Sequence, residues 1–308
     1  MTLIPRTDLD VFGLNLGCNV FGWTADRDES FAVLDAYRAA GGNFLDTADL
    51  YTARAPGNQG GESETIIGEW LATRDNRDEI VIATKVGGFP GLAGLDPTTV
   101  RAATENSLKR LGIEAIDLLY AHFDDPDTPV AETLGALGEL IEAGKVRYIA
   151  ASNFTTERLA EALAAAEHEG LPRYVAFQPH YNLMERDFEH EQRQICEREG
   201  LAVFPYFSLA KGFLTGKYRP DGEQIDSPRA AGAAEYLDER GGRMLAALDQ
   251  IAAAHRVEPA AVAVAWLRAQ PTVTAPIASA RNEGQLAPLL AAVELALEAD
   301  ELARLTAI

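Results

Sequence analysis

The chain has 308 residues, of which 47% are hydrophobic, so it is long enough to bury a large core, and its 47 acidic and 27 basic residues give a net charge of −20. Nucleic-acid binding needs clustered Lys and Arg, and the scattered arginines argue against it. The two cysteines and five dispersed histidines match neither a disulfide framework nor a metal site, and without a bilayer-spanning run or a secretory signal we expect a cytoplasmic protein.

Short apolar runs rich in β-branched residues alternate with longer amphipathic stretches. The runs predicted as strands are 14–20, 43–46, 80–85, 116–122, 146–152, 174–178, 201–206 and 273–277. The stretches predicted as helices are 28–40, 62–73, 97–111, 130–143, 155–169, 187–199, 240–255 and 259–269. This alternation implies a parallel sheet with helical crossovers. At this length it favours a single-domain (β/α)8 TIM barrel over residues 1–308.

Turn and cap residues agree with these boundaries: glycines at Gly41-Gly42 and Gly144 follow helices, and Pro97 and Pro259 stand in first turns. The segments 52–61 and 207–238 are longer than a minimal barrel needs, and Gly87–Gly94 is expected to be a flexible rim loop. Both long segments follow the carboxyl ends of strands, where barrel active sites lie. They are therefore predicted to be lids or binding loops.

Ionisable residues stand where barrel strands should be apolar. The second predicted strand ends at Asp46, with Tyr51 just beyond, the third ends at Lys85 and the fourth at His122. Each is costly to bury unless it is paired. We therefore expect a carboxylate, a phenol, an ammonium and an imidazole to meet at one rim of the barrel.

This combination of groups predicts carbonyl chemistry. Asp46 is expected to pair with Lys85, whose charge should lower the pKa of Tyr51 and make it a general acid. His122 is expected to orient a substrate carbonyl by a hydrogen bond. No Cys or Ser stands beside a base as a nucleophile, so a hydride from a cofactor is the expected attacker.

At these residues the sequence resembles the aldo-keto reductase family along nearly the whole chain. The similar segments are NFLDTADLY (43–51), GESE (61–64), ATKV (83–86), DLLYAHFDDP (117–126) and GKVRYIAASNF (144–154). The resemblance implies reduction of an aldehyde or ketone, with NADPH preferred to NADH. It also implies a catalytic tetrad of Asp46, Tyr51, Lys85 and His122, in which Tyr51 donates the proton.

The resemblance further implies cofactor-binding positions. They are Ser152, Asn153 and Gln178 for the nicotinamide carboxamide, Tyr206 for ring stacking, Ser208, Leu209, Lys211 and Gly212 over the pyrophosphate, and Ser279, Arg281 and Gln285 at the adenosine phosphate. Arg281 is expected to face the 2′-phosphate at the start of a short helix. Many relatives have Ser-Pro-Leu where this chain has Phe207-Ser208-Leu209, and Gly and Asn are common where Ser279 and Leu289 stand.

Several interpretations stay open. Trp23 and Phe123 are expected to line the substrate side, and Phe21 and Phe89 are further candidates for an apolar wall. A cofactor-binding regulatory subunit of the same fold, like the cofactor-sensing β subunits of potassium channels, is the first alternative. An aldolase with Lys85 as Schiff-base nucleophile is another, which the expected partner Asp46 disfavours. The sequence leaves the carbonyl substrate and the oligomeric state undetermined.

Overall fold

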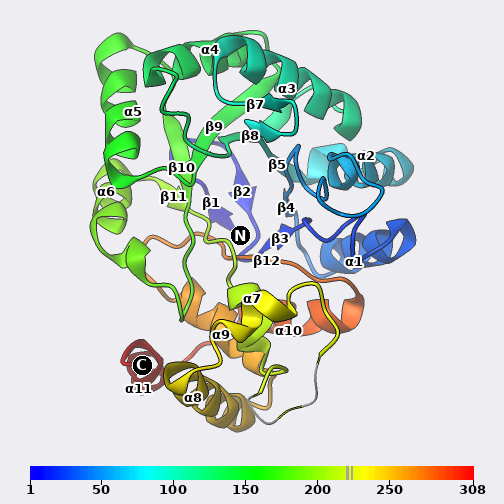
Figure 1. The fold of residues 1–308 in the computed structure, drawn as a ribbon, viewed down its shortest axis with the longest axis vertical. Coiled ribbons are helices and arrows are strands. Elements are labelled where there is room, and N and C mark those ends of the chain that lie inside the picture. Colours follow the sequence, from blue (N-terminus) through cyan, green and yellow to red (C-terminus); the bar gives the residue numbers. More distant parts are fainter. Residues whose placement is uncertain (220–221, 223–224) are drawn as a thin grey trace.

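The computed structural model describes residues 1–219, 222 and 225–308; residues 220–221 and 223–224, inside the predicted loop 207–238, lie outside the described residues. Eight parallel strands form a curved sheet with the neighbour order β11-β10-β9-β8-β5-β4-β3-β12 (Figure 1). They are β3 (Asn15–Gly17), β4 (Phe44–Asp46), β5 (Val81–Val86), β8 (Ile116–Ala121), β9 (Val146–Ser152), β10 (Tyr174–Gln178), β11 (Ala202–Val203) and β12 (Ile277–Ala278).

Backbone hydrogen bonds join the two ends of this sheet. The N–H of Thr274 donates to the carbonyl of Val203 at 2.9 Å, and the N–H of Ile277 donates to the carbonyl of Pro205 at 2.8 Å. The eight-stranded sheet therefore closes, and its own strands have no free edge among the described residues. The predicted (β/α)8 barrel is confirmed.

Helices surround the barrel and follow the predicted alternation through its first six strands. They are α1 (Arg27–Ala39), α2 (Glu62–Arg74), α3 (Pro97–Leu111), α4 (Val130–Glu142), α5 (Thr156–Glu169), α6 (Glu191–Glu199), α7 (Ala230–Ala234), α8 (Glu239–His255), α9 (Pro259–Arg268), α10 (Glu283–Glu294) and α11 (Ala299–Thr306). Pro97 and Pro259 occupy first turns as predicted, where a missing N–H costs nothing. Among the described helices, none is both long and apolar enough to cross a membrane.

Several segments differ from the predicted elements, among them α7, which lies inside the predicted loop 207–238. The rim segment after β5 is a hairpin of β6 (Gly88–Phe89) and β7 (Leu92–Ala93), closed by a 3.0 Å bond between Gly94 N–H and Gly87 O. The predicted helix 187–199 is broken at His190, where ψ is −120°, into a 3-10 turn (Asp187–Glu189) and α6. The helix α11 and most of α10 were not predicted, and Pro288 stands inside α10.

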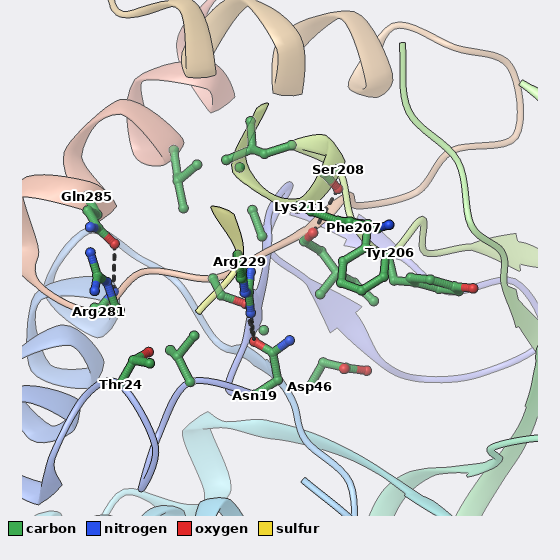
Figure 2. Close-up of a pocket in the computed structure, with 18 of the residues that line it drawn as sticks. Asn19, Thr24, Asp46, Tyr206, Phe207, Ser208, Lys211, Arg229, Arg281 and Gln285 are labelled. Carbon is green, nitrogen blue, oxygen red and sulfur yellow. Dashed lines mark hydrogen bonds between the residues drawn. The ribbon is translucent and has the colours of Figure 1, made fainter. Parts of the chain in front are cut away.

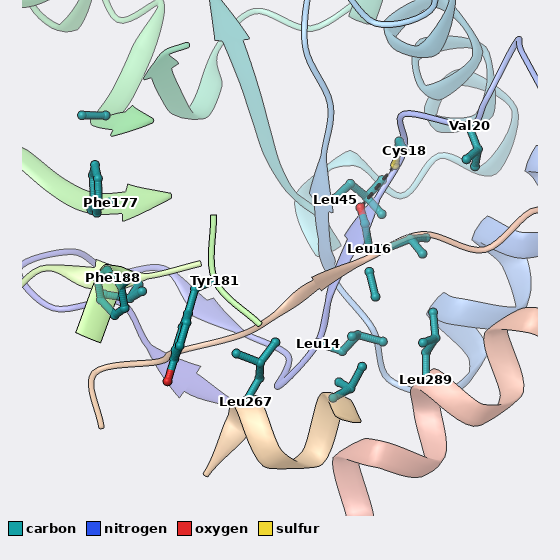
Figure 3. Close-up of a cluster of buried hydrophobic side chains, with 14 of the residues drawn as sticks. Leu14, Leu16, Cys18, Val20, Leu45, Phe177, Tyr181, Phe188, Leu267 and Leu289 are labelled. Carbon is teal, nitrogen blue, oxygen red and sulfur yellow. Dashed lines mark hydrogen bonds between the residues drawn. The ribbon is translucent and has the colours of Figure 1, made fainter. Parts of the chain in front are cut away.

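Side chains alternate between the two faces of each barrel strand, so the buried hydrophobic residues form two separate cores, one outside and one inside the barrel. Leu14 and Leu16 belong to the outer cluster, together with Leu267 of α9 and Leu289 of α10 (Figure 3). A smaller cluster fills the barrel interior, where the rings of Phe44 and Phe204 meet edge to face at 5.1 Å.

A short hairpin closes the amino-terminal end of the barrel. It consists of β1 (Thr2–Leu3) and β2 (Asp10–Val11), and Ile4 and Val11 join the interior cluster. Asn43, which precedes β4, donates to the carbonyl of Asp10 at 2.9 Å and ties the hairpin to that end. The opposite, carboxyl-terminal end holds the polar strand ends.

Candidate active site

The carboxyl ends of four barrel strands present polar side chains to the barrel interior. Residues two apart on a strand face the same side, and the last inward apolar residues are Phe44, Ala83, Tyr120 and Ala176. The next inward positions hold Asp46, Lys85, His122 and Gln178. The strand pattern therefore brings these four together.

The ammonium of Lys85 is fully buried, and all its hydrogen atoms have acceptors. It forms an ion pair with Asp46, and it donates to the carbonyl of Thr47 at 2.8 Å and to the hydroxyl of Tyr51 at 2.9 Å. The second oxygen of Asp46 accepts from Nε2 of Gln178 at 2.9 Å. A buried ion pair is tolerated when such hydrogen bonds complete it.

Tyr51 reaches this group from the loop after β4, which Glu62 organises. The carboxylate of Glu62 accepts from the hydroxyl of Thr52 at 2.5 Å and from the N–H of Gln59 at 2.7 Å. Asn58 donates to the carbonyl of Gly22 at 2.7 Å. The predicted binding loop 52–61 is thus fixed at both ends against α2 and the segment after β3.

Burial dominates the electrostatics of the tyrosine and the lysine. It raises the pKa of Tyr51 well above its ordinary value, and the charge of Asp46 adds to the rise. Burial also lowers the pKa of Lys85, while Asp46 opposes that shift. The prediction that Lys85 lowers the pKa of Tyr51 is therefore wrong in this structure. The phenol stays protonated, as a proton donor must.

His122 lies beside Tyr51 with 7% of its surface exposed. Its ring is 6.1 Å from that of Tyr51 and stacks on Phe123 at 4.3 Å. Burial, helped by the charge of Lys85, holds the pKa of His122 well below its ordinary value, so the imidazole is neutral near pH 7. Nδ1 has no hydrogen-bond partner among the described residues.

The residues predicted to bind the carboxamide form a connected group. The hydroxyl of Ser152 donates to the backbone carbonyl of Gln178 at 2.9 Å, and the amide of Asn153 donates to the carbonyl of His122 at 2.9 Å. The hydroxyl of Tyr206 donates to Oδ1 of Asn153 at 2.7 Å. Asn153 has a φ of 55°, a left-handed conformation that asparagine tolerates.

The loop predicted to cover a pyrophosphate has an unusual backbone. Phe207, Ala210, Lys211 and Gly212 have φ values of 52°, 47°, 58° and 96°. The hydroxyl of Ser208 donates to the carbonyl of Ile277 at 2.7 Å and holds the loop against β12. The N–H groups of Ala210 and Gly212 donate to the carbonyls of Phe207 and Leu209 at 2.7 and 2.9 Å, so tight turns fix the shape of this loop.

The predicted adenosine-phosphate residues meet at the start of α10. The N–H of Arg281 donates to Oε1 of Gln285 at 3.2 Å, and Asn282 caps the helix. Ser279 donates to Oδ1 of Asn19 at 2.8 Å. The amino-terminal end of this twelve-residue helix, with a guanidinium beside it, is suited to bind a phosphate group.

The predicted catalytic and cofactor-binding residues line one cavity of about 650 Å³ (Figure 2), except Lys85, which lies behind Tyr51. It runs from the tetrad past Tyr206 to Arg281 and Gln285. Trp23 and Phe123, the predicted substrate-side residues, line it with 40% and 43% of their surfaces exposed. Phe21 is buried in the core and Phe89 lies on the β6–β7 hairpin, so neither of these candidates lines it.

Two residues that sequence reasoning missed, Arg229 and Asn19, lie in the middle of this cavity. Arg229 donates to Oδ1 of Asn19 at 3.2 Å (Figure 2), and among the described residues no carboxylate pairs with it. Burial lowers the pKa of Arg229. The local sequence, Ser-Pro-Arg in a long loop, has no periodicity that would have placed this guanidinium in the site.

The described part of the chain contains no group of three or more His, Cys, Asp or Glu side chains that could hold a metal ion. The acids and histidine of the site are instead engaged with Lys85 or lie apart.

Comparison with known proteins gives one consistent family. The model of the family described as Aldo/keto reductase family matches residues 13–308. Protein tas of Escherichia coli (strain K12) is 32% identical, over 99% of this chain and 96% of that protein. Norsolorinic acid reductase B of Aspergillus parasiticus is 32% identical over 97% and 81%. An aryl-alcohol dehydrogenase of Pestalotiopsis microspora is 31% identical over 97% and 79%.

Proposed function

The chain belongs to the aldo/keto reductase family, and we propose that it reduces an aldehyde or ketone to an alcohol with NADPH, using Tyr51 as the proton donor. The reaction is reversible in principle. The observation that best supports this function is the 2.9 Å hydrogen bond from the Lys85 ammonium to the Tyr51 hydroxyl, in a cavity that Tyr51 itself lines.

The charges of the cavity fit a dinucleotide with several phosphates. The protein as a whole has a net charge of −20. Yet Lys211, Lys217, Arg229 and Arg281 line the cavity, and Glu258 is the one carboxylate besides Asp46 among its described lining residues. Concentrated positive charge in an acidic protein favours an anionic ligand.

The proposed roles follow from the contacts. A bound reduced nicotinamide supplies a hydride to the substrate carbon. His122, as a neutral imidazole, donates a hydrogen bond to the carbonyl oxygen and orients it beside Tyr51. Tyr51 gives its proton to that oxygen as negative charge develops, because an alkoxide is a stronger base than a phenolate. The Lys85 ammonium, already bonded to the phenol oxygen, stabilises the charge left there.

Two groups of residues are proposed to hold the cofactor. Ser152, Asn153, Gln178 and Tyr206 surround the nicotinamide end, and the second group surrounds the phosphates: Ser208, Leu209, Lys211, Gly212, Arg229, Ser279, Arg281 and Gln285. Arg229 extends the set that the sequence implied. Its guanidinium, which has no carboxylate partner among the described residues, lies between the tetrad and Arg281, where a phosphate would compensate its loss of solvent.

We propose an aromatic carbonyl as the substrate class. Trp23, Phe123 and Phe207 are large apolar side chains with 37% to 43% of their surfaces exposed, and all three line the cavity. Exposed aromatic surface at a cavity is typical of a binding site. The relative named as an aryl-alcohol dehydrogenase agrees with this choice.

A panel of aromatic and aliphatic aldehydes, assayed with NADPH and with NADH in the presence of EDTA, tests the proposal. Turnover of an aromatic aldehyde is expected. Activity that EDTA abolishes and a divalent ion restores would contradict it. Tight cofactor binding without turnover of any carbonyl would favour the regulatory-subunit alternative instead.

The aldolase alternative fits less well. A Schiff-base lysine needs a depressed pKa in a setting without a counter-charge, and Lys85 is paired with Asp46 behind Tyr51. Failure of borohydride to trap a substrate on the protein is the expected outcome.

A further inference from the structure

His180 lies behind Tyr206, on the side away from the cavity. The two rings stack with centroids 5.1 Å apart and planes at 13°. Tyr206 lines the cavity and His180 does not. The ring of Phe207 meets that of His180 edge to face at 5.5 Å. The cavity wall therefore consists of two aromatic layers at this point. The layer farther from the cavity is the ring of His180, which is ionisable.

The backbone and a side-chain bond fix this stack. His180 and Tyr206 form a parallel β-bridge, and the N–H of Tyr206 donates to the carbonyl of Pro179 at 3.0 Å. The phenol of Tyr206 is held from the far side by its 2.7 Å bond to Asn153. Because the tyrosine is held at both ends, His180 keeps a constant distance from whatever stacks on the cavity face.

The imidazole is poised to change its charge in acid. Its Nε2 is buried without a hydrogen-bond partner among the described residues. Burial lowers the pKa of His180, Lys211 lowers it further, and the charges of Glu185 and Asp187 oppose the shift. These three are the charged groups that face the ring, from the turn after β10 and from the loop after β11. The imidazole is therefore neutral at pH 8, and it gains a proton only when the pH falls below the ordinary pKa of histidine.

We propose that His180 is a positioning residue for the nicotinamide, and that its charge makes the site discriminate between the oxidised and reduced cofactor. This inference rests on the proposed cofactor role of Tyr206. The nicotinamide ring is positively charged in NADP⁺ and neutral in NADPH. An imidazolium behind the Tyr206 ring therefore repels NADP⁺ and leaves NADPH nearly unaffected. Low pH consequently favours binding of NADPH over binding of NADP⁺.

The ratio of the two dissociation constants, Kd(NADP⁺) to Kd(NADPH), tests the proposal. Isothermal titration calorimetry measures it at pH 8 and in steps down to about pH 5. The 2′-phosphate also titrates near pH 6, with a pKa of about 6, but it is common to both forms and cancels in the ratio. For like charges roughly 9 Å apart, the ratio should rise about 3- to 20-fold on acidification.

Three variants separate charge from packing. His180→Phe keeps an aromatic layer without a charge, and its ratio should not change with pH. His180→Arg keeps a planar group with a permanent charge, and its ratio should already be raised at pH 8. His168→Phe removes an exposed histidine of α5 and should retain the wild-type pH dependence.

Equal ratios in His180→Arg and His180→Phe at pH 8, with both cofactor forms bound, would overturn the inference and leave the proposed reductase function standing. The same conclusion follows if His180→Phe retains the wild-type rise. If neither cofactor form binds at pH 8, the proposed function fails and this inference fails with it.

Discussion

The Lys85 ammonium and the Tyr51 hydroxyl are 2.9 Å apart, with the ammonium as donor. The phenol oxygen therefore already accepts a hydrogen bond from a cation, and its own proton makes only a long hydrogen bond of 3.4 Å to Oδ1 of Asp46. Burial keeps the pKa of Tyr51 high, so that proton is present across the physiological pH range. The same contact therefore keeps the Tyr51 phenol in place as the acid and stabilises the phenolate that forms when it gives up its proton.

Tyr51→Phe should abolish turnover while leaving cofactor binding nearly unchanged. The ring shape is retained and only the proton donor is removed, so kcat should fall by about 10²- to 10⁴-fold, the usual contribution of a positioned acid. Steady-state kinetics measure the loss, and titration of NADPH measures binding. A variant with half of the wild-type kcat would contradict the assignment of Tyr51.

Lys85→Met should destabilise the protein because it leaves the Asp46 carboxylate buried without its counter-charge. Removing one partner of a buried pair costs about 3 to 5 kcal/mol. The double variant Asp46→Asn, Lys85→Met should recover most of that stability in urea unfolding, since no charge stays buried. Activity should be lost in both, because Tyr51 has no ammonium beside it. If the double variant is no more stable than Lys85→Met, the charge argument is incorrect.

Asp49 is a fully buried carboxyl whose two oxygens have no partner among the described residues. Burial, together with the charge of Glu64, raises its pKa to about 7. The folded protein thus holds a proton that the unfolded chain releases near pH 4. Between these values the folded state binds more protons, so this group makes the protein less stable as the pH rises toward 7.

Asp49→Asn should therefore stabilise the protein more at pH 8 than at pH 5. The difference between the two pH values is on the order of 3 kcal/mol, at about 1.4 kcal/mol for each pH unit between 5 and the raised pKa. Urea unfolding of wild type and variant at both pH values measures it. Asp78→Asn, at an exposed position, is the control and should show no such difference. Equal gains at pH 5 and pH 8 would show that Asp49 does not titrate in this range.

The barrel was predictable because each strand carries its own pattern. Short apolar runs ended by Asp46, Lys85 and His122 show both where the strands stop and which rim holds the site. Parallel strands bring their carboxyl ends to one edge, so sequence-distant ends become neighbours. Only the start of α10 was predicted, because Pro288 argues against a helix interior.

What the sequence did not predict depends on tertiary burial. The pKa of Tyr51 rises because the folded protein removes solvent from the phenol, and no local sequence pattern indicates that burial. Arg229 reaches the cavity from a loop without periodicity, and its neighbour Asn19 is 210 residues away in the chain. His180 stacks on Tyr206 only because β10 and the segment after β11 run side by side.

The two cavity arginines should have separable effects on the cofactor. Arg281 lies at the start of α10, where the 2′-phosphate is proposed to bind, and Arg229 lies nearer the tetrad. Hydrogen bonds to charged groups contribute roughly 1.5 to 3 kcal/mol. Arg281→Ala should therefore weaken NADPH by about 10- to 150-fold, at about 1.4 kcal/mol per decade, and leave NADH nearly unchanged because NADH lacks that phosphate.

Arg229→Met should weaken NADPH and NADH alike, because the phosphates between the two ends of the cavity are common to both. Titration of both cofactors at fixed ionic strength distinguishes the two arginines, and Arg243→Ala, an exposed arginine of α8, is the control. At about 0.15 M salt, charges farther than roughly 8 Å away are screened, so the net negative charge of the protein should have little effect on the comparison. Equal losses of NADPH and NADH in Arg281→Ala would show that this arginine does not bind the 2′-phosphate. A wild-type preference for NADH would reverse the cofactor proposal and leave the roles of Tyr51 and Lys85 intact.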